Sequence, residues 1–283
     1  MNQIQISELS SFINTNLTDN FSKRKKENIL KKYLSLYLNI SNSDIILNKS
    51  IPWSNINKSK LKDHLVKINE GIPIQYVIKK EFFYNYIFKV SDRVLIPRPE
   101  TEELVSKIIN LEKANKKLKI LEIGSGSGCI SITLKKELIN PFITAIDISK
   151  SAIKIAENNA NILNADINFL CKDFFHYSTK EKFDIIISNP PYIPLKDKKF
   201  VDKLVYKNEP YNALFVGSDP LIFYKKILNF SINYLNKNGR VYFEINDIYK
   251  DRMKKYLDLF HSNVKYEFLK DMQRKYRFLF LNF

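Results

Sequence analysis

Residues Ser188 to Pro194 read SNPPYIP and continue an apolar run, FDIIIS, that is typical of a buried strand. Proline has no backbone N–H and a fixed φ, so a Pro-Pro pair presents carbonyl oxygens without a competing donor. The side-chain oxygen of Asn189 and the carbonyl oxygen of Pro190 could accept the two hydrogens of a planar NH₂ group. Tyr192 could lie flat against that group. This stretch predicts recognition of a conjugated amine or amide, although two prolines can also simply end a strand.

Three of the six glycines, Gly124, Gly126 and Gly128, follow the apolar run KILEI. A loop that leaves a parallel strand and opens a helix can bring bare backbone against a ligand only where side chains are absent. The G-x-G-x-G spacing differs from the G-x-G-x-x-G of dinucleotide folds, and tight turns also use glycine. The next strand, FITAID, ends in Asp147, whose carboxylate could accept both hydroxyls of a ribose or cap the following helix. The combination favours a ligand that carries a ribose.

From Lys119 onward, strands and helices alternate, which is typical of βαβ units and of a parallel sheet with helices on both faces. The carboxyl ends of such strands lie at one edge, where these folds bind ligands. The third strand, INFLCKD, ends in Asp173, which would flank an adenine at that edge, and Phe174 could stack on the adenine ring. The last two strands, VKYEFLKD and YRFLFLNF, follow each other closely and should pair antiparallel at one edge of the sheet.

The chain before Lys119 divides into further parts. Residues 1–70 carry apolar side chains at spacings of three and four, which predicts a small all-α helical bundle domain. Residues 71–93 are rich in aromatic and β-branched side chains and predict a β-hairpin connector with its turn near Asn85. Residues 94–283 then form the larger α/β domain.

The formal net charge is +16, from 46 Lys and Arg against 30 Asp and Glu. This charge favours a polyanionic partner such as RNA, although a general excess of Lys, Asn and Ile would also produce it. Cys129 and Cys171 form no CxxC pair and the three histidines lie far apart, so neither a disulfide framework nor a metal site is expected. No apolar run is long enough to cross a bilayer, and the first residues lack the pattern of a targeting peptide, which predicts a cytoplasmic protein.

The segments LEIGSGSG, AIDIS, KDFF and NPPY, in this order, resemble the cofactor-binding core of the class I S-adenosylmethionine-dependent methyltransferases. The resemblance implies a Rossmann-like, mostly parallel seven-stranded sheet with an antiparallel C-terminal strand, and S-adenosylmethionine as the cofactor. The residues it assigns to the cofactor are Glu122, Gly124, Ser125, Gly126, Ser127, Gly128, Asp147, Asp173, Phe174 and Asn189. The residues it assigns to catalysis are Asn189, Pro190 and Tyr192, and Pro191 joins them in binding the substrate. The acceptor is then an exocyclic adenine nitrogen or a glutamine amide nitrogen.

Three further segments resemble the bacterial peptide chain release factor glutamine methyltransferases: IPRPETEE, GIPIQYVIKKEFF and NEPYNAL. This resemblance spans essentially the whole chain. It implies methylation of the glutamine in the Gly-Gly-Gln loop of class I release factors by a monomer whose residues 1–70 recognise the protein substrate, with no need for direct nucleic-acid binding.

Three alternatives stay open at this point. A sister enzyme methylates a glutamine of a ribosomal protein and usually has serine where Pro99 stands. An adenine methyltransferase acting on RNA or DNA would also use NPPY, but such enzymes for DNA generally append a recognition domain. A binding protein could keep the fold without catalysis. The chain also departs from the release factor family pattern, because the glycines expected near Asn246 and Arg274 are missing.

Overall fold

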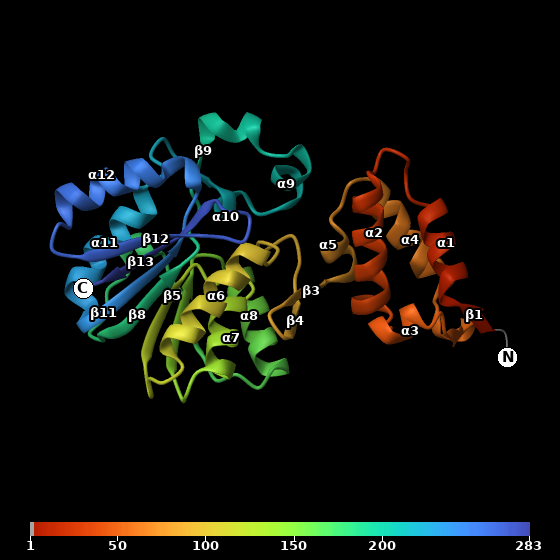
Figure 1. Ribbon diagram of the computed structural model, residues 1–283, viewed down its shortest axis with the longest axis horizontal. Coiled ribbons are helices and arrows are strands. Elements are labelled where there is room, and N and C mark those ends of the chain that lie inside the picture. Colours follow the sequence, from red (N-terminus) through yellow and green to blue (C-terminus); the bar gives the residue numbers. More distant parts are fainter. Residues whose placement is uncertain (1–2) are drawn as a thin grey trace. The chain divides into compact units, whose positions relative to one another are not determined.

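The computed structural model describes residues 3–283, which divide into two compact units (Figure 1). The first unit contains the chain up to Phe82 together with Val90–Asp92, and the second contains Phe83–Lys89 and Arg93–Phe283. Strands β3 (Lys80–Phe83) and β4 (Tyr86–Lys89) form a two-stranded sheet and are joined at Tyr84 and Asn85. Each unit has a hydrophobic core of its own.

The first unit is a helical bundle with one short pair of strands. Its helices are α1 (Ile6–Thr15), α2 (Lys23–Lys32), α3 (Asn42–Ile46), α4 (Lys58–Asn69) and α5 (Ile74–Ile78). Their apolar side chains form one core around Leu9, Ile13 and Tyr33. Strands β1 (Gln3–Gln5) and β2 (Ser50–Pro52) pair antiparallel, which the all-α prediction did not include. Three residues are too few for an alternating pattern to identify a strand.

The second unit is built on a seven-stranded sheet. The strands are β5 (Lys119–Ile123), β6 (Phe142–Asp147), β7 (Asn168–Cys171), β8 (Phe183–Ser188), β11 (Leu235–Glu244), β12 (Lys265–Lys270) and β13 (Tyr276–Asn282). Their order is β12-β13-β11-β8-β5-β6-β7. Strand β13 pairs antiparallel with both of its neighbours, whereas all other neighbours pair in parallel. The predicted antiparallel final pair is confirmed, and the last strand lies inside the sheet with β12 at the edge.

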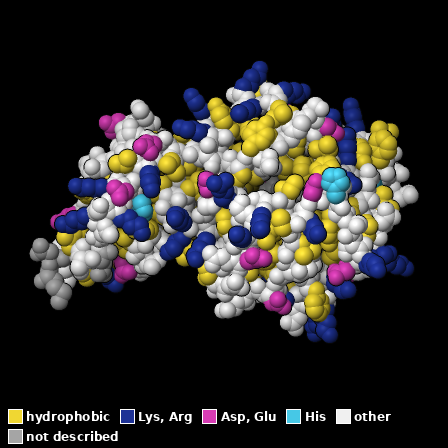
Figure 2. All heavy atoms as spheres, turned by 180° about the vertical axis from the view of Figure 1, so that it is seen from behind, with side chains coloured by type: hydrophobic (Ala, Val, Ile, Leu, Met, Phe, Trp, Pro, Cys, Tyr) yellow, Lys and Arg dark blue, Asp and Glu magenta, His cyan; other side chains and the backbone are white. Residues whose placement is uncertain are grey.

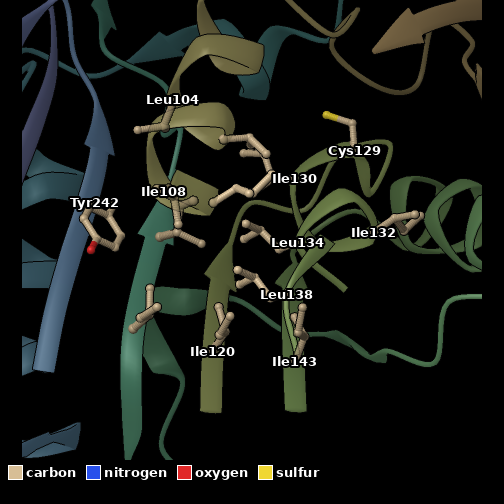
Figure 3. Close-up of a cluster of buried hydrophobic side chains, with 14 of the residues drawn as sticks. Leu104, Ile108, Ile120, Cys129, Ile130, Ile132, Leu134, Leu138, Ile143 and Tyr242 are labelled. Atoms are coloured by element: carbon tan, nitrogen blue, oxygen red, sulfur yellow. The ribbon is translucent and has the colours of Figure 1, made fainter. Parts of the chain in front are cut away.

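Helices cover both faces of this sheet because successive strand residues point to opposite sides. Ile185 and Ile187 of β8 belong to the cluster on one face, and Ile186 between them belongs to the cluster on the other. Figure 3 shows the first cluster, in which side chains from helices and strands interdigitate. The helices on this face are α6 (Pro99–Glu112), α7 (Cys129–Glu137) and α8 (Lys150–Ile162). Those on the other face are α11 (Ile222–Tyr234) and α12 (Lys250–Phe260).

The chain between β8 and α11 forms a small two-stranded sheet and short helical segments that are not part of the seven-stranded sheet. Strand β9 (Ile193–Pro194) follows the NPPY stretch and pairs in parallel with β10 (Phe215–Val216). The residues between them form a 3₁₀ segment (Leu195–Phe200), α9 (Lys203–Asn208) and α10 (Tyr211–Leu214). This structure therefore begins at the carboxyl end of β8 (Figure 1).

A membrane-crossing helix and a metal-binding cluster are both absent from the described residues. Among them there is no helix with the length and apolar character that crossing a membrane requires. Within the same part of the chain, no three His, Cys, Asp or Glu side chains come together in a group that could hold a metal ion.

Candidate active site

The glycine loop after β5 is tied to the end of β6 by three hydrogen bonds. The backbone N–H groups of Gly124 and Ser125 donate to the carbonyl oxygen of Ile146, at 2.8 and 3.1 Å. The N–H of Gly126 donates to Oδ2 of Asp147 at 2.9 Å. The structure therefore brings together two features that the sequence could only place in order, the glycine loop and the acid at the end of the next strand.

The three glycines of this loop share a positive φ but differ in the space around each Cα atom. All three have positive φ, at 82° for Gly124, 52° for Gly126 and 80° for Gly128, which L-residues with side chains adopt at a cost. A Cβ on Gly128 would lie 3.0 Å from Ile132 Cδ1 and 3.1 Å from Ala156 Cβ, so this glycine allows α7 to pack closely on α8. A Cβ on Gly124 or Gly126 would meet no atom within 4 Å. Their backbone borders open space.

Asp147 has a structural role as well as the capacity to hold a ligand. Its Oδ1 accepts the N–H of Ser149 at 2.9 Å, and Ser149 caps α8 by accepting the N–H of Ala152. Burial raises the pKa of the Asp147 carboxyl above its ordinary value. Each oxygen of an ionised carboxylate has a second lone pair, so two ribose hydroxyls could still donate to Asp147. The structure supports the helix-start interpretation of this residue and is compatible with the ribose interpretation.

Glu122 and two serines leave polar atoms unpaired beneath the loop. Glu122 is 1% exposed, and its Oε2 accepts the N–H of Ser131 at 3.2 Å. Its Oε1 and the hydroxyls of Ser125 and Ser127 are buried without a hydrogen-bond partner among the described residues. Burial raises the pKa of Glu122 to about 8. Because buried polar atoms in native proteins are nearly always paired, these orphan atoms fit a polar ligand beside the loop.

The residues after β7 form a compact turn. Asp173 accepts the N–H of Phe175 at 2.9 Å and contacts Nδ1 of His176 at 2.8 Å. The Phe175 hydrogen bond and the neighbouring His176 hold the pKa of Asp173 below its ordinary value. Phe174 is 5% exposed, and its ring meets Phe230 edge-on at 5.4 Å inside the core. The stacking of Phe174 on an adenine therefore stays a prediction.

The NPPY stretch begins where β8 ends beside the glycine loop. The hydroxyl of Ser188 donates to the carbonyl oxygen of Ile123 at 2.7 Å, which joins the end of β8 to the end of β5. The Nδ2 of Asn189 donates to Oγ1 of Thr101 at 3.1 Å. Since the nitrogen of this carboxamide donates to Thr101, its oxygen points away from Thr101. The predicted acceptor thus lies at the same sheet edge as the loop.

Tyr192 is half-buried and packs against the hydrophobic cluster on the sheet face that α11 and α12 cover. Burial, together with the nearby Glu244 carboxylate, raises the pKa of the Tyr192 hydroxyl to about 12. The phenol is therefore neutral at physiological pH and offers a flat apolar face. Pro190 is buried and Pro191 is half-buried, as a rigid turn at the sheet edge requires.

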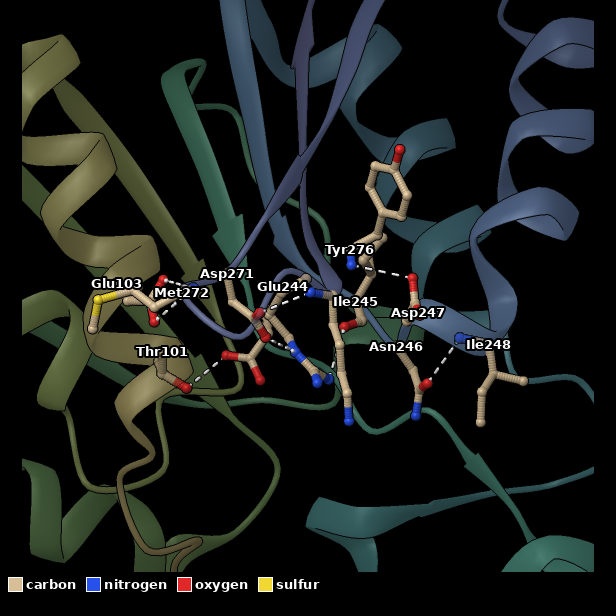
Figure 4. A network of polar contacts seen from close by, with 12 residues as sticks. Thr101, Glu103, Glu244, Ile245, Asn246, Asp247, Ile248, Asp271, Met272 and Tyr276 are labelled. Atoms are coloured by element: carbon tan, nitrogen blue, oxygen red, sulfur yellow. Dashed lines mark hydrogen bonds and ion pairs between the residues drawn. The ribbon is translucent and has the colours of Figure 1, made fainter.

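Four residues around this site were not singled out from the sequence. Thr101, at the start of α6, donates to Oε2 of Glu244 at 2.6 Å (Figure 4). Arg98 forms an ion pair with the buried Glu209, which links the residue before α6 to the residue after α9. The segments IPRPETEE and NEPYNAL contain three of these residues, but pairs separated by more than a hundred residues leave no local signal in one sequence.

Comparison with known proteins places the chain in a family. Residues 101–213 match a family model described as Methyltransferase small domain. The release factor glutamine methyltransferase of Flavobacterium psychrophilum is 40% identical over 231 residues, covering 80% of this chain and 81% of the relative. That of Bacillus cereus is 35% identical over 277 residues, covering 96% and 95%. A Thermus thermophilus 16S rRNA N2 G1207 methyltransferase, solved with AdoMet and guanosine, has a TM-score of 0.50 at 13% identity, covering 72% of this chain and 49% of its own.

The strand order, the glycine loop and the antiparallel β13 define the second unit as a class I methyltransferase fold. At 35% identity over nearly the full length of both chains, the relationship with the Bacillus cereus protein extends through both units. The chain belongs to the family of release factor glutamine methyltransferases.

Proposed function

We propose that this chain transfers a methyl group from S-adenosylmethionine to the side-chain amide nitrogen of the glutamine in the Gly-Gly-Gln motif of class I release factors. The observation that carries the proposal is the Asn189 carboxamide, whose nitrogen is held by Thr101 so that its oxygen can accept from a substrate NH₂ group. Family membership supports the choice of a release factor glutamine over an adenine or a ribosomal protein.

The cofactor fits the open side of the glycine loop. The backbone of Gly124 and Gly126 borders space that a side chain would fill, and Glu122 has a buried carboxyl oxygen without a hydrogen-bond partner beneath it. Asp147 would receive the ribose hydroxyls, and the turn at Asp173 would flank the adenine. When bound, S-adenosylmethionine supplies a methyl group on a sulfonium, which is an excellent leaving group.

The chain's own contribution to the chemistry is orientation of the amide. A carboxamide nitrogen is a poor nucleophile because its lone pair is delocalised into the carbonyl group. The oxygens of Asn189 and Pro190 would each accept one of its hydrogens and so fix the direction in which the lone pair emerges. Tyr192 would lie against the amide plane and exclude water. Holding two reacting groups in line can contribute about 7 to 11 kcal/mol. Once methylated, the amide nitrogen would carry a surplus proton and would release it to solvent, so no general base is required before attack.

The first unit is proposed to recognise the release factor, with the chain acting as a monomer in the cytoplasm, where translation terminates. The alternative of an RNA substrate rests on the net charge of +16. On the face shown in Figure 2, Lys and Arg side chains are spread widely and mixed with acidic ones instead of forming one continuous patch. Such a distribution supports a compositional origin of the charge, and direct nucleic-acid binding is not required for the proposed reaction.

The test is to incubate the purified protein with methyl-labelled S-adenosylmethionine and one of three acceptors. These are a purified class I release factor, the same factor with its Gly-Gly-Gln glutamine changed to alanine, and total RNA. Label in the unaltered factor alone is the expected result. Label in RNA alone would overturn the proposal in favour of an adenine methyltransferase, and label in none of the three would favour a binding protein.

A further inference from the structure

A chain of three polar side chains lies behind the NPPY stretch and connects three separate elements. Asn189 at the end of β8 donates to Thr101 in the first turn of α6, and Thr101 donates to Glu244, the last residue of β11. The two distances are 3.1 and 2.6 Å. Thr101 and Glu244 are each only 4% exposed, so the hydrogen bond between them is shielded from water, whereas Asn189 is half-buried. Figure 4 shows the Thr101 side chain directed at the Glu244 carboxylate.

We propose that Thr101 and Glu244 are positioning residues that set the orientation of the Asn189 carboxamide, so that its oxygen and not its nitrogen faces the substrate amide. This inference rests on the proposed function, because it explains how the acceptor in that reaction is oriented. Neither residue touches the substrate or the cofactor in this scheme, and both act through Asn189.

The direction of the chain follows from its donors and acceptors. An ionised carboxylate can only accept hydrogen bonds, so the Thr101 hydroxyl must donate its single hydrogen to Glu244. The Thr101 oxygen is then left as an acceptor, and the group facing it must be a donor. A rotated Asn189 would place its carbonyl oxygen against the Thr101 oxygen, two acceptors with no hydrogen between them. The NH₂ group of Asn189 is therefore held inward and its oxygen outward.

The backbone around the three residues keeps them in register. Phe243, next to Glu244, pairs with Ser188, next to Asn189, in the parallel ladder of β11 and β8. Glu244 pairs with Phe278 in the ladder of β11 and β13, and its carbonyl oxygen accepts the Tyr224 hydroxyl at 3.0 Å. A group held by regular elements keeps its geometry better than one held by loops.

The surroundings of Glu244 make its charge sensitive to pH near neutrality. Burial raises the pKa of its carboxyl to about 7, while the Thr101 hydrogen bond and Arg277 act in the opposite direction. The charged and titratable groups that face it are Arg277 on β13, Arg98 and Glu100 at the start of α6, Tyr192 after β8, and Tyr224 on α11. When the carboxyl is protonated it can itself donate to Thr101, and the orientation of Asn189 is no longer enforced.

The decisive comparison uses three substitutions of buried threonines. Thr101→Val keeps the volume but removes the hydroxyl, Thr101→Ser restores the hydroxyl, and Thr133→Val removes a buried hydroxyl of α7 that has no hydrogen-bond partner among the described residues. For Thr101→Val we expect kcat for release factor methylation to fall about 10- to 100-fold, the effect of one buried hydrogen bond. The dissociation constant for S-adenosylmethionine should stay within about twofold. Thr101→Ser should recover most of kcat, and Thr133→Val should match the wild type.

Two results would overturn the inference. One is an unchanged kcat in Thr101→Val, and the other is an equal loss in the Val and Ser variants, which would mean that the site needs the threonine methyl group for packing. If Thr101→Val does not fold, Glu244→Gln decides instead, because its amide oxygen can still accept from Thr101. The wild-type kcat should rise as pH increases through about 7, and this rise should flatten in Glu244→Gln. If kcat still rises with pH in Glu244→Gln, Glu244 is not the group whose ionisation controls turnover.

A readout that needs no turnover separates this inference from the proposed function. In protein labelled with ¹⁵N at asparagine, the Asn189 side-chain NH₂ signal, assigned by its loss in Asn189→Ala, should shift in Thr101→Val and stay in place in Thr133→Val. If the wild type fails to methylate the release factor but this shift is present, the proposed function fails and the hydrogen-bonded chain stands. If the wild type methylates the release factor but the Asn189 signal does not shift in Thr101→Val, the proposed function stands and the positioning role of Thr101 fails.

Discussion

The glycine loop and the NPPY stretch follow neighbouring strands of one sheet, yet they are held by different kinds of contact. The loop is shaped mainly by its own backbone, with positive φ at three glycines and N–H groups that donate to Ile146 and Asp147. The carboxamide of Asn189 is oriented by a side chain from α6, which a residue of β11 supports in turn. The proposed cofactor half of the site is therefore held by contacts between neighbouring strands 21 residues apart along the chain, whereas the contacts of the proposed acceptor half span 88 and 143 residues.

Asn189→Ala should give the largest effect and tests the acceptor half. Removing one preorganised hydrogen-bonding group from a reaction centre typically costs about 100- to 1,000-fold in kcat, and the glycine loop should be untouched. We therefore expect turnover to collapse while the affinity for S-adenosylmethionine, measured by calorimetry, stays nearly intact. Asn161→Ala, on an exposed position of α8, is the matched control. Equal loss of turnover and cofactor affinity would show that Asn189 is structural and that the two halves are not separable.

Glu122 tests how the buried carboxyl beneath the glycine loop, in the cofactor half, changes the free energy of unfolding with pH. Its folded-state pKa of about 8 lies above the ordinary value of 4.5, so between these pH values the folded protein holds a proton that the unfolded chain has released. The stability associated with this proton is present below pH 4.5 and is lost as pH rises toward 8. A tenfold difference in proton affinity between the two states corresponds to about 1.4 kcal/mol, and we expect a measurable loss of roughly 2 to 3 kcal/mol.

Urea denaturation of the cofactor-free protein between pH 5 and 8 measures this slope. Glu122→Gln cannot ionise and should reduce the fall in unfolding free energy, and the part that remains comes from other buried carboxyls such as Glu244, whose pKa is raised to about 7. The control Glu157→Gln, on an exposed position of α8, should leave the slope unchanged. A wild-type slope in Glu122→Gln would show that another group binds the proton.

Gly128→Ala and Gly124→Ala should separate packing from ligand binding within the loop. Both alanines would have unfavourable positive φ, but only Gly128→Ala would also press against Ile132 and Ala156. We expect Gly128→Ala to lower the unfolding free energy by about 1 to 3 kcal/mol. Gly124→Ala should cost about 1 kcal/mol in stability while weakening S-adenosylmethionine binding more strongly.

Thermal unfolding with and without the cofactor measures both effects. Gly217→Ala is the control, because Gly217 has no positive φ and a Cβ there would meet no atom within 4 Å. If Gly124→Ala binds the cofactor as the wild type does, the space beside Gly124 is not the cofactor site.

Arg274→Gly should give the smallest effect and concerns the turn behind the acceptor half. Arg274 lies between β12 and β13 with φ of 64°, a conformation that favours glycine. Arg274, which stands where the family pattern expects a glycine, therefore has a strained backbone conformation. Replacing it with glycine should raise the unfolding free energy by about 0.5 kcal/mol. Lys275→Gly, one residue further on and outside the positive-φ residues, should lower it by a similar amount. Destabilisation by both changes would show that the Arg274 side chain matters more than its backbone.

Asn246, the other position where the family pattern expects a glycine, has no strained backbone. Asn246 has φ of −94°, and its side chain accepts the N–H of Ile248 at 3.0 Å. A residue with a side chain therefore fits this backbone conformation without strain, and a glycine would lose the hydrogen bond to Ile248. The two departures from the family pattern look alike in sequence, and only the backbone conformation tells them apart.

The sequence by itself determined the strands of the sheet, the glycine loop and the position of NPPY at the end of a strand. Each of these depends on local chemistry: apolar runs of strand length, glycines that permit positive φ, and prolines that cannot continue a ladder. Only the tertiary structure decided that β13 lies between β11 and β12, that β1 pairs with β2, and that Thr101 and Glu244 stand behind Asn189. Thr101 and Glu244 are 143 residues apart, and they meet because α6 packs on the sheet, so their hydrogen bond is set by packing and not by spacing along the chain.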